Sequence, residues 1–174
     1  MQKQKLRESI QDKFSEISEE EKSFFNENIF ENFKNIFSLE THLKIGSYVS
    51  KNNEVSTKAI NEFILEKGSS LYLPKVKSQK NLKKLKFLKF SNNDSLELND
   101  YGILEPKDKR KSIKPEFLDF IIIPVRGINK ANKRLGFGGG FYDKSLAKVN
   151  KLKFVGICYD CLLYTSDAAD EPMR

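Results

Sequence analysis

The chain is poor in the residues from which many common sites are built. Its 174 residues include one histidine, two cysteines and no tryptophan. Cys158 and Cys161 have the spacing of a metal or redox pair, but a zinc site needs two further ligands and His42 lies far away in sequence. No run of about 18 apolar residues is present, which excludes a membrane-spanning helix. The residues after Met1 are amphipathic rather than apolar, so we expect no secretory signal and a cytoplasmic protein.

Arginine is also scarce, although the chain is basic. Lysine and arginine together number 31 against 24 acidic residues, giving a net charge of +7, yet only five of the basic residues are arginine. Nucleic-acid readers favour arginine, because its planar fork matches phosphates and guanine edges. The lysine-rich stretch from Lys75 to Lys89 is either a polyanion-binding surface or a solvated strand protected against aggregation. We favour the solvated strand and keep a basic nucleic-acid-binding module as the alternative function.

Hydrophobic periodicity predicts one domain in which helices and strands alternate. We predict helices, the second of them with a Ser18–Glu21 capping box, over residues 3–14, 19–37, 56–66 and 142–149. We predict strands, two of them stopped by Pro74 and Pro124, over residues 42–50, 71–73, 85–87, 120–123 and 154–158. This alternation is typical of an α/β three-layer sandwich with a mostly parallel, Rossmann-like central sheet.

The most informative segment is the run RLGFGGGFYD, from Arg134 to Asp143. Four of the nine glycines of the chain fall within five of its positions. Glycine lets the backbone approach a ligand, and a turn between a strand and a helix presents N–H groups that favour phosphate. Arg134 suits phosphate oxygens, and Asp143 suits a magnesium ion that bridges them. The run matches neither G-x-x-x-x-G-K-[ST] nor G-x-G-x-x-G, so it is either a phosphate cradle of another kind or a glycine-rich turn without a ligand.

The same run resembles the R-L-G-x-G-x-G-[YF]-Y-D signature of the 5-formyltetrahydrofolate cyclo-ligase family, also called 5,10-methenyltetrahydrofolate synthetases. Further stations of the family pattern follow in order between about Lys3 and Asp160. They are KQKLR at 3–7, YVS at 48–50 with EV at 54–55 and Thr57, LP at 73–74, GILEP at 102–106 and IP at 123–124. Their shared order argues against coincidence.

The resemblance implies an ATP- and Mg²⁺-dependent ligase that converts 5-formyltetrahydrofolate to 5,10-methenyltetrahydrofolate, releasing ADP and phosphate. It implies a monomer whose partners are small molecules, not nucleic acids or membranes, and it leaves the catalytic residues unknown. ATP contacts are implied for Lys3, Gln4, Lys5, Leu6, Arg7, Arg134, Leu135, Gly136, Phe137, Gly138, Gly139, Gly140, Phe141 and Tyr142. Substrate contacts are implied for Val49, Glu54, Phe137, Gly138, Gly139, Gly140 and Phe141, and magnesium ligation for Asp143.

Several of these residues also have a purely structural interpretation. The charges at 3–7 suit a solvated helix surface, Glu54 suits a turn, and Phe141 and Tyr142 suit a core. The chain departs from the family at 124–129, where it reads PVRGIN in place of the usual P-G-x-[AG]-F-D. Arg126 in that segment is either a phosphate ligand or a surface charge. A phosphosugar- or coenzyme-A-handling relative on a similar sheet is a further alternative, which the glycine run argues against.

The end of the chain differs in style from the lysine- and asparagine-rich sequence before it. The run CLLYTSDAADE resembles the conceptual translation of a transposon-end sequencing adapter. We therefore predict a cyclo-ligase-like domain over 1–160, incomplete at its C-terminus, and a read-through tail at 161–174. The family resemblance implies a second magnesium-associated aspartate beyond this point. We expect Asp167 and Asp170 not to replace it, and the chain as written to bind ATP weakly and turn over poorly.

Ligand tests separate the predicted enzyme from the basic module. ATP and 5-formyltetrahydrofolate should each raise the melting temperature, because a ligand that binds only the folded state stabilises it. A nucleic-acid-binding module should instead bind any DNA, with an affinity that falls steeply as salt increases. Thermal denaturation with each ligand, and DNA titration at low and high salt, measure the two behaviours directly.

Overall fold

The computed structural model describes residues 2–39, 41–76, 84–107, 111–129, 134–147 and 153–164. Its helices are α1 (Gln2–Glu16), α2 (Glu19–Ile36), α3 (Lys58–Glu66) and α4 (Phe141–Leu146), with 3₁₀ turns η1 (Pro115–Phe117) and η2 (Asp160–Leu162). Its strands are β1 (Lys44–Gly46), β2 (Ser70–Val76), β3 (Leu85–Phe90), β4 (Leu96–Leu98), β5 (Leu104–Pro106), β6 (Ser112–Ile113), β7 (Phe120–Pro124), β8 (Gly127–Asn129), β9 (Arg134–Leu135), β10 (Lys153–Ile157) and β11 (Leu163–Tyr164).

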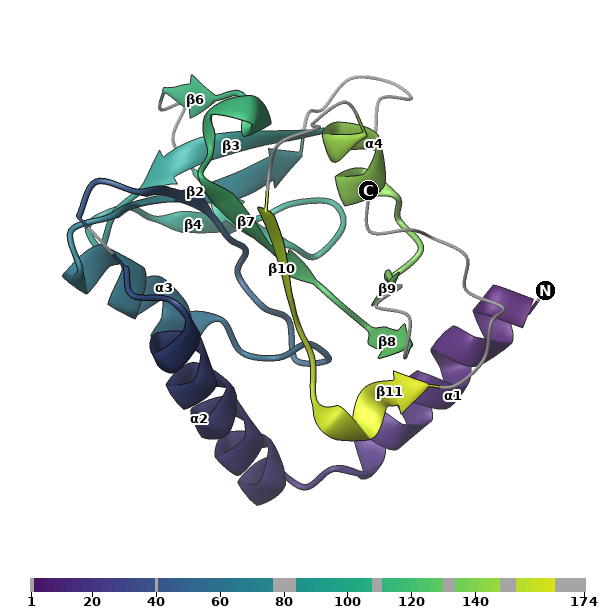
Figure 1. The fold of residues 1–174 in the computed structure, drawn as a ribbon. Helices are drawn as coiled ribbons and strands as arrows, with labels where there is room; N and C mark the ends of the chain where they lie inside the picture. The colour runs from purple at the N-terminus through teal and green to yellow at the C-terminus, as the bar shows by residue number, and fades with distance from the viewer. Residues whose placement is uncertain are drawn as a thin grey trace.

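A six-stranded sheet in the order β10-β7-β1-β2-β3-β6 forms the centre of the molecule (Figure 1). The first four strands in that order run parallel, β3 pairs antiparallel with β2, and β6 pairs antiparallel with β3. Two smaller units stand beside this sheet: β11-β8-β9, and the hairpin of β4 and β5. The predicted α/β fold with a mostly parallel central sheet is confirmed.

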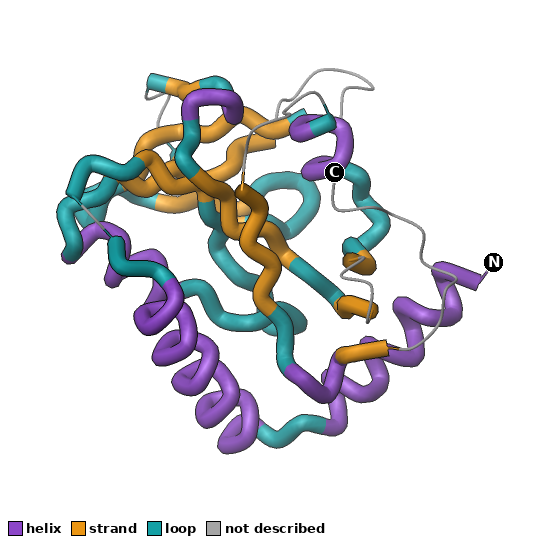
Figure 2. The backbone as a smooth tube through the Cα atoms, viewed as in Figure 1, coloured by secondary structure: helices purple, strands orange, loops and turns teal. Residues whose placement is uncertain are grey.

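The central strand β7 separates two apolar cores. All five of its residues are buried, as the continuous apolar run predicts. Ile122 belongs to the larger core, which α1, α2 and α3 cover, whereas Ile121 and Ile123 belong to a smaller core that includes Leu146 of α4. Successive side chains of a strand point to opposite faces, so this one segment holds the helices of both outer layers in place (Figure 2).

The predicted helices form, although not every apolar residue on them is buried. α1 and α3 have almost the predicted bounds, and α4 begins at Phe141 and ends at Leu146. On α2 the buried residue is Phe33, while Phe24 is 60% and Ile36 is 72% exposed. The face of α2 that packs on the sheet is therefore narrower than the apolar pattern indicates.

Two strand predictions are corrected. β1 occupies only Lys44–Gly46 of the predicted 42–50. β2 continues through Pro74 to Val76 instead of stopping at the proline. Tyr72 accepts a hydrogen bond from Ser47 N on the β1 side, so alternation turns Pro74 to that same side, beyond the end of β1. The missing N–H of Pro74 therefore breaks no ladder bond.

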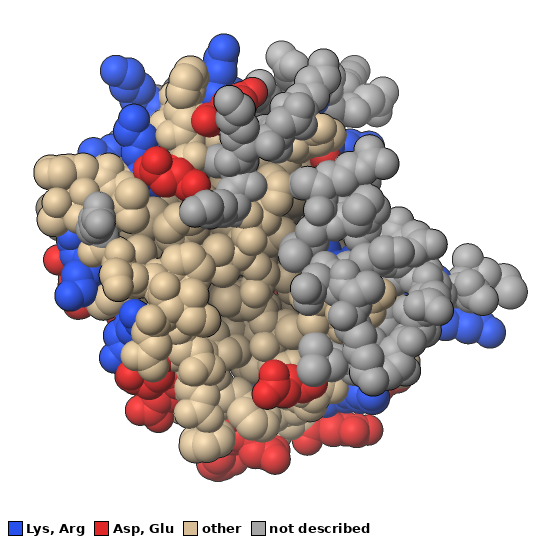
Figure 3. Space-filling view, viewed as in Figure 1, with Lys and Arg blue, Asp and Glu red and all other residues tan. Residues whose placement is uncertain are grey.

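The charged side chains of the surface are mixed. On the face shown in Figure 3, basic side chains are most frequent at the top and acidic side chains along the lower rim, but each region also contains charges of the other sign. The basic charge thus forms no continuous surface on this face.

Among the described residues, no helix combines the length and the apolar character needed to cross a bilayer.

The capping box of α2 gives a stability prediction. Glu21 N donates to Ser18 Oγ at 3.2 Å, and Ser18 N donates to Glu21 Oε2 at 2.9 Å. Ser18→Ala should lower the free energy of unfolding by about 1 kcal/mol, because it leaves an N–H of the first turn without its acceptor. The exposed Ser23→Ala, in the middle of the same helix, should change it by less than about 0.5 kcal/mol. Urea denaturation of both variants measures the difference, and equal effects would contradict it.

Candidate active site

A cavity of about 360 Å³ opens where three parallel strands of the central sheet end. Tyr48 and Val49 follow β1, Val76 ends β2 and Pro124 ends β7, so their side chains meet at the carboxyl edge of the sheet. Open α/β sheets bind their ligands at this edge. The lining residues are Arg7, Tyr48, Val49, Lys51, Asn53, Glu54, Pro74, Val76, Leu85, Tyr101, Ile103, Pro124, Arg134, Gly136, Phe137, Gly138, Gly139, Gly140, Phe141, Tyr142 and Asp143.

The glycine loop, residues 136–140, forms one wall of this cavity between β9 and α4. Arg7 of α1 crosses to it and donates from Nε to the Gly136 carbonyl oxygen at 2.8 Å. Gly138 has a φ of +92°, and a Cβ built there would lie 3.5 Å from Arg7 Cζ. A Cβ on Gly136 would lie 2.9 Å from a guanidinium nitrogen of Arg134. At Gly136 the absence of a Cβ lets Arg134 pack directly against the loop backbone, and at Gly138 glycine accommodates the positive φ beside Arg7.

Arg134 and Asp143 form an ion pair at the edge of the cavity. The Arg134 side chain is 8% exposed, whereas the Asp143 side chain is 49% exposed. The buried guanidinium is therefore fixed by its surroundings, while the carboxylate can turn toward solvent or toward a bound cation. Their pairing keeps the charge of Arg134 compensated inside the protein.

The opposite wall comes from the segment between β1 and α3. Glu54 accepts a hydrogen bond from Lys51 N at 2.8 Å. Burial raises the pKa of the Glu54 carboxyl above its ordinary value, and Lys51 opposes that shift only in part. Burial, with a smaller contribution from Glu54, also raises the pKa of the Tyr48 and Tyr142 hydroxyls, so both phenols remain protonated. The cavity therefore has a partly buried carboxylate acceptor at Glu54 and two protonated phenols, Tyr48 after β1 and Tyr142 in α4.

The cavity brings together most, but not all, of the sequence-predicted site residues. Val49, Glu54, Arg7 and every residue of 136–143 line it, together with Arg134. The remaining residues of the predicted ATP site do not line it, namely Lys3, Gln4, Lys5, Leu6 and Leu135. Gln4 donates to Glu8 and Leu6 packs against the larger core, while Leu135 is 1% exposed.

Arg126 is neither the phosphate ligand nor the surface charge that the sequence suggested. Its Nε donates to the Arg7 carbonyl oxygen at 3.0 Å, and Nη2 donates to Gln11 Oε1 at 2.7 Å. Its guanidinium lies 5.2 Å from the centre of the Phe137 ring. Arg126 thus contacts both α1 and Phe137 of the glycine loop, and it is not among the residues that line the cavity.

Sequence reasoning missed a further wall of the cavity, the turn between β4 and β5. Tyr101 and Ile103 of this turn line the cavity, and the Tyr101 ring meets Phe141 edge-on with ring centres 5.2 Å apart. The GILEP station at 102–106 is the signal that marks this turn in the sequence. It indicated family membership and gave no reason to place the turn over the glycine loop.

The two cysteines lie outside the cavity. Both thiols are free, and burial raises the pKa of Cys158 to about 11. No group of three or more potential metal ligands occurs within the described ranges. Of the predicted tail at 161–174, the structure describes Cys161–Tyr164, where Leu162 is buried in the larger core. Residues 165–174, with both tail aspartates, lie outside the described residues, and the boundary at 160 remains a prediction.

Residues 1–166 match the 5-formyltetrahydrofolate cyclo-ligase family. The chain belongs to that family. Over 120 residues it is 34% identical to a 5-formyltetrahydrofolate cyclo-ligase of Haemophilus influenzae. That alignment covers 67% of this chain and 64% of the relative, so it spans slightly less than two thirds of the relative's length. The resemblance predicted from the glycine run and the other stations is confirmed.

Two solved structures of similar proteins share the fold. The chain superposes on a 5,10-methenyltetrahydrofolate synthetase of Aquifex aeolicus with a TM-score of 0.80 at 28% identity, covering 95% of this chain and 82% of that one. A 5,10-methenyltetrahydrofolate synthetase of Mycoplasma pneumoniae gives a TM-score of 0.73 at 25% identity, covering 97% and 93%. The cyclo-ligase fold thus extends over nearly the whole chain.

The buried Glu54 gives a pH prediction. Its pKa in the folded protein is raised above the ordinary 4.5, so ionisation of Glu54 destabilises the fold as pH rises through that range. Glu54→Gln keeps an acceptor for Lys51 N and removes the charge. The variant should be more stable than the parent at about pH 7 and should lose this advantage at about pH 4, where the carboxyl is protonated in both states.

Urea denaturation at both pH values tests this expectation. The exposed Glu62→Gln on α3 is the matched control and should leave the pH dependence unchanged. A stability gain from Glu54→Gln that is equal at both pH values would show that burial of the charge is not its cause.

Proposed function

We propose that this protein closes the ring of 5-formyltetrahydrofolate to give 5,10-methenyltetrahydrofolate, in a magnesium-dependent reaction that consumes ATP and releases ADP and phosphate. The observation that carries the proposal is that one cavity joins the glycine loop and its two arginines to the wall of Val49 and Glu54. The reaction needs the nucleotide and the folate in contact with each other, and a single cavity with two chemically different walls meets that need.

The nucleotide belongs to the wall formed by the glycine loop. Arg7 and Arg134 lie against the loop backbone, and both line the cavity. Guanidinium groups pair with phosphate oxygens at two points and keep their charge at every physiological pH. Within segment 3–7 we assign the nucleotide contact to Arg7, because its four neighbours do not line the cavity.

The residues present fit a magnesium ion that arrives with the nucleotide. Proteins hold Mg²⁺ through one or two carboxylates plus substrate phosphates and water, and seldom through a complete protein cage. Asp143 is the half-exposed carboxylate next to the glycine loop, and we assign it to the metal. When bound, the ion would neutralise the charge of the transferred phosphoryl group.

The folate belongs to the opposite wall. Val49, Pro74 and Ile103 supply apolar surface, and the Glu54 carboxylate supplies a buried acceptor beside them. A reduced pterin has a planar pyrimidine ring edged with N–H donors and a puckered, partly apolar second ring, so it matches an apolar cleft with one such acceptor. Phe137 of the glycine loop and Phe141, the first residue of α4, line the cavity and would contact both molecules.

The chemistry follows from this juxtaposition. The formyl oxygen attacks the terminal phosphorus of ATP, and ADP leaves. The formyl oxygen, a poor leaving group by itself, thereby becomes part of a phosphate ester. The neighbouring folate nitrogen attacks the activated carbon and loses its proton to solvent, and the carbon–oxygen bond breaks so that phosphate departs as the ring closes. The protein contributes positioning and neutralisation of charge, the two effects on which phosphoryl transfer mainly depends.

We also propose that the protein acts as a cytoplasmic monomer on small molecules and not on nucleic acid. Within the lysine-rich stretch, residues 77–83 lie outside the described residues. Lys75 is held in ion pairs with two glutamates, while Lys84, Lys86 and Lys89 are exposed on or beside β3. In its described part this stretch exposes three lysines and contains no arginine, which is a weak basis for reading nucleic acid.

The proposed nucleotide site is tested by two matched substitutions on α1. Arg7→Gln should weaken ATP binding by about tenfold or more, because it removes a guanidinium that faces the cavity. Lys5→Gln makes the same charge change on the exposed side of the helix and should change the affinity by less than about twofold. Isothermal calorimetry with Mg-ATP and, separately, with 5-formyltetrahydrofolate measures both.

Methenyl product formation is followed by its absorbance in the same preparations. Binding of both ligands, with the loss of ATP affinity confined to Arg7→Gln, supports the proposal. Equal losses of ATP affinity in the two variants would show that Arg7 does not contact the nucleotide. A wild-type chain that binds neither ligand at millimolar concentration would refute the proposed function.

A further inference from the structure

We propose that Glu105 is a positioning residue. The turn at 99–103 forms one wall of the cavity, and Glu105 holds this turn in the position in which the cavity binds its ligands. The carboxylate touches no cavity-lining side chain of the glycine loop and acts through Asn99. The consequence for ligand affinity rests on the proposed function, whereas the placement of the turn does not.

The turn connects the two halves of the cavity. Its Tyr101 ring contacts Phe141 at the end of the glycine loop, edge to face, with an angle of 75° between the ring planes. The carbonyl oxygen of the same residue accepts a hydrogen bond from Lys51 Nζ at 3.0 Å, next to the wall that holds Glu54. A displacement of this turn would therefore open the cavity toward both proposed ligands.

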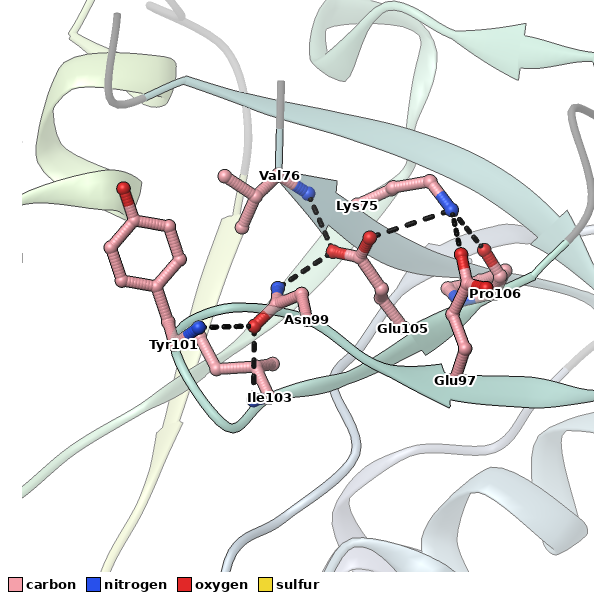
Figure 4. A network of polar contacts seen from close by, with 8 residues as sticks. All are labelled: Lys75, Val76, Glu97, Asn99, Tyr101, Ile103, Glu105 and Pro106. Atoms are coloured by element: carbon pink, nitrogen blue, oxygen red, sulfur yellow. Dashed lines mark hydrogen bonds and ion pairs between the residues drawn. The ribbon is translucent and has the colours of Figure 1, made fainter. Parts of the chain in front are cut away.

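The turn takes its shape from the Asn99 side chain. Asn99 Oδ1 accepts hydrogen bonds from Tyr101 N at 3.0 Å and from Ile103 N at 3.1 Å (Figure 4). The backbone closes the turn with two further bonds, from Asn99 N to Ile103 O at 3.0 Å and from Gly102 N to Asn99 O at 2.9 Å. One amide group thus organises the four residues that follow it.

Glu105 fixes that amide to the central sheet. Its Oε2 accepts hydrogen bonds from Asn99 Nδ2 at 2.8 Å and from Val76 N at 3.0 Å, and its Oε1 lies 3.4 Å from Lys75 Nζ (Figure 4). Lys75 also donates to Glu97 Oε1 at 2.7 Å and to Pro106 O at 2.8 Å. The carboxylate therefore joins the end of β2, which lines the cavity, to the turn.

The burial of Glu105 calls for a reason other than stability. The residue is 6% exposed, and a buried ion pair contributes little net stability compared with apolar residues of the same size. The carboxylate adds directional hydrogen bonds, because its Oε2 accepts from Val76 N on β2 and from Asn99 Nδ2 at the turn. An apolar side chain would fill the same space and leave Asn99 free to rotate.

The two glutamates keep the Lys75 ammonium charged. Burial by itself lowers the pKa of the Lys75 ammonium, but the hydrogen bonds and charges of Glu97 and Glu105 outweigh burial and leave the pKa above its ordinary value. Lys75 therefore stays protonated at neutral pH and keeps Glu105 paired.

The absence of tryptophan from the chain permits a direct test. Tyr101→Trp places a single tryptophan on the turn, and quenching of its fluorescence by acrylamide reports how well the turn is held. In that background the informative variants are Asn99→Ala, Glu105→Ala and the two combined. The control is Glu97→Gln, which removes a carboxylate from the same Lys75 without touching Asn99 or Val76.

Asn99→Ala and Glu105→Ala should each raise the quenching constant by about twofold, and the double variant should add little more, because both act through one contact. Affinity for 5-formyltetrahydrofolate, measured by calorimetry, should fall by about tenfold in the same variants. Glu97→Gln should leave both quantities unchanged. The melting temperature is recorded for each variant, so that quenching is compared among folded proteins.

Unchanged quenching in Asn99→Ala would overturn the proposal, even where Glu105→Ala fails to fold. Independent, additive effects of the two substitutions would also overturn it, as would an equal effect of Glu97→Gln. A loosened turn with unaltered folate affinity would refute the link to ligand binding. A reporter protein that binds no folate would count against the proposed function alone, and the quenching data would still decide the role of Glu105.

Discussion

The candidate site depends on the contact between the first helix and the glycine loop. Arg7 and Gly136 are 129 positions apart, yet a hydrogen bond from one to the other joins α1 to the wall formed by the glycine loop. Arg126 donates a hydrogen bond to the Arg7 carbonyl oxygen, so Arg7 is held at its backbone as well as at its side chain. Since the loop at 136–140 contributes little side-chain volume of its own, this contact largely determines where its amides lie.

Rigid and adjustable parts of the site have different origins. The carboxyl ends of β1, β2 and β7 are anchored by two apolar cores that share the buried strand β7. The turn at 99–103 belongs to a separate two-stranded hairpin and is held to the sheet by polar contacts through Glu105. A site of this construction combines a fixed sheet edge with a wall that polar contacts and the Tyr101–Phe141 ring contact hold in place.

The sequence predicts much of this fold because its strongest signals are local. The capping box at Ser18 and the apolar run at 120–123 lead directly to α2 and to β7. The signals that failed depend on distant partners. Pro74 stops a strand only where its nitrogen faces a neighbour, and here β1 has already ended on that side.

The candidate site shows the same limit. Arg7 and Lys5 are equivalent in sequence, being basic residues on one short helix, and only the packing of α1 determines that one of them faces the cavity. The contribution of Tyr101 depends on the hairpin of β4 and β5, which has no counterpart in the predicted set of strands. Resemblance to the family supplied the motif residues, and the tertiary structure selected among them.

The ion pair of Arg134 and Asp143 has a consequence for how the cavity fills. Without a ligand the two charges compensate each other. A bare cation that took Asp143 would leave the buried Arg134 guanidinium unpaired, whereas the half-exposed Asp143 can be solvated when an anion takes Arg134. Under the proposed function, a polyphosphate that arrives with its metal ion would satisfy both partners in one exchange, and this balance of charge would favour it over the free metal ion.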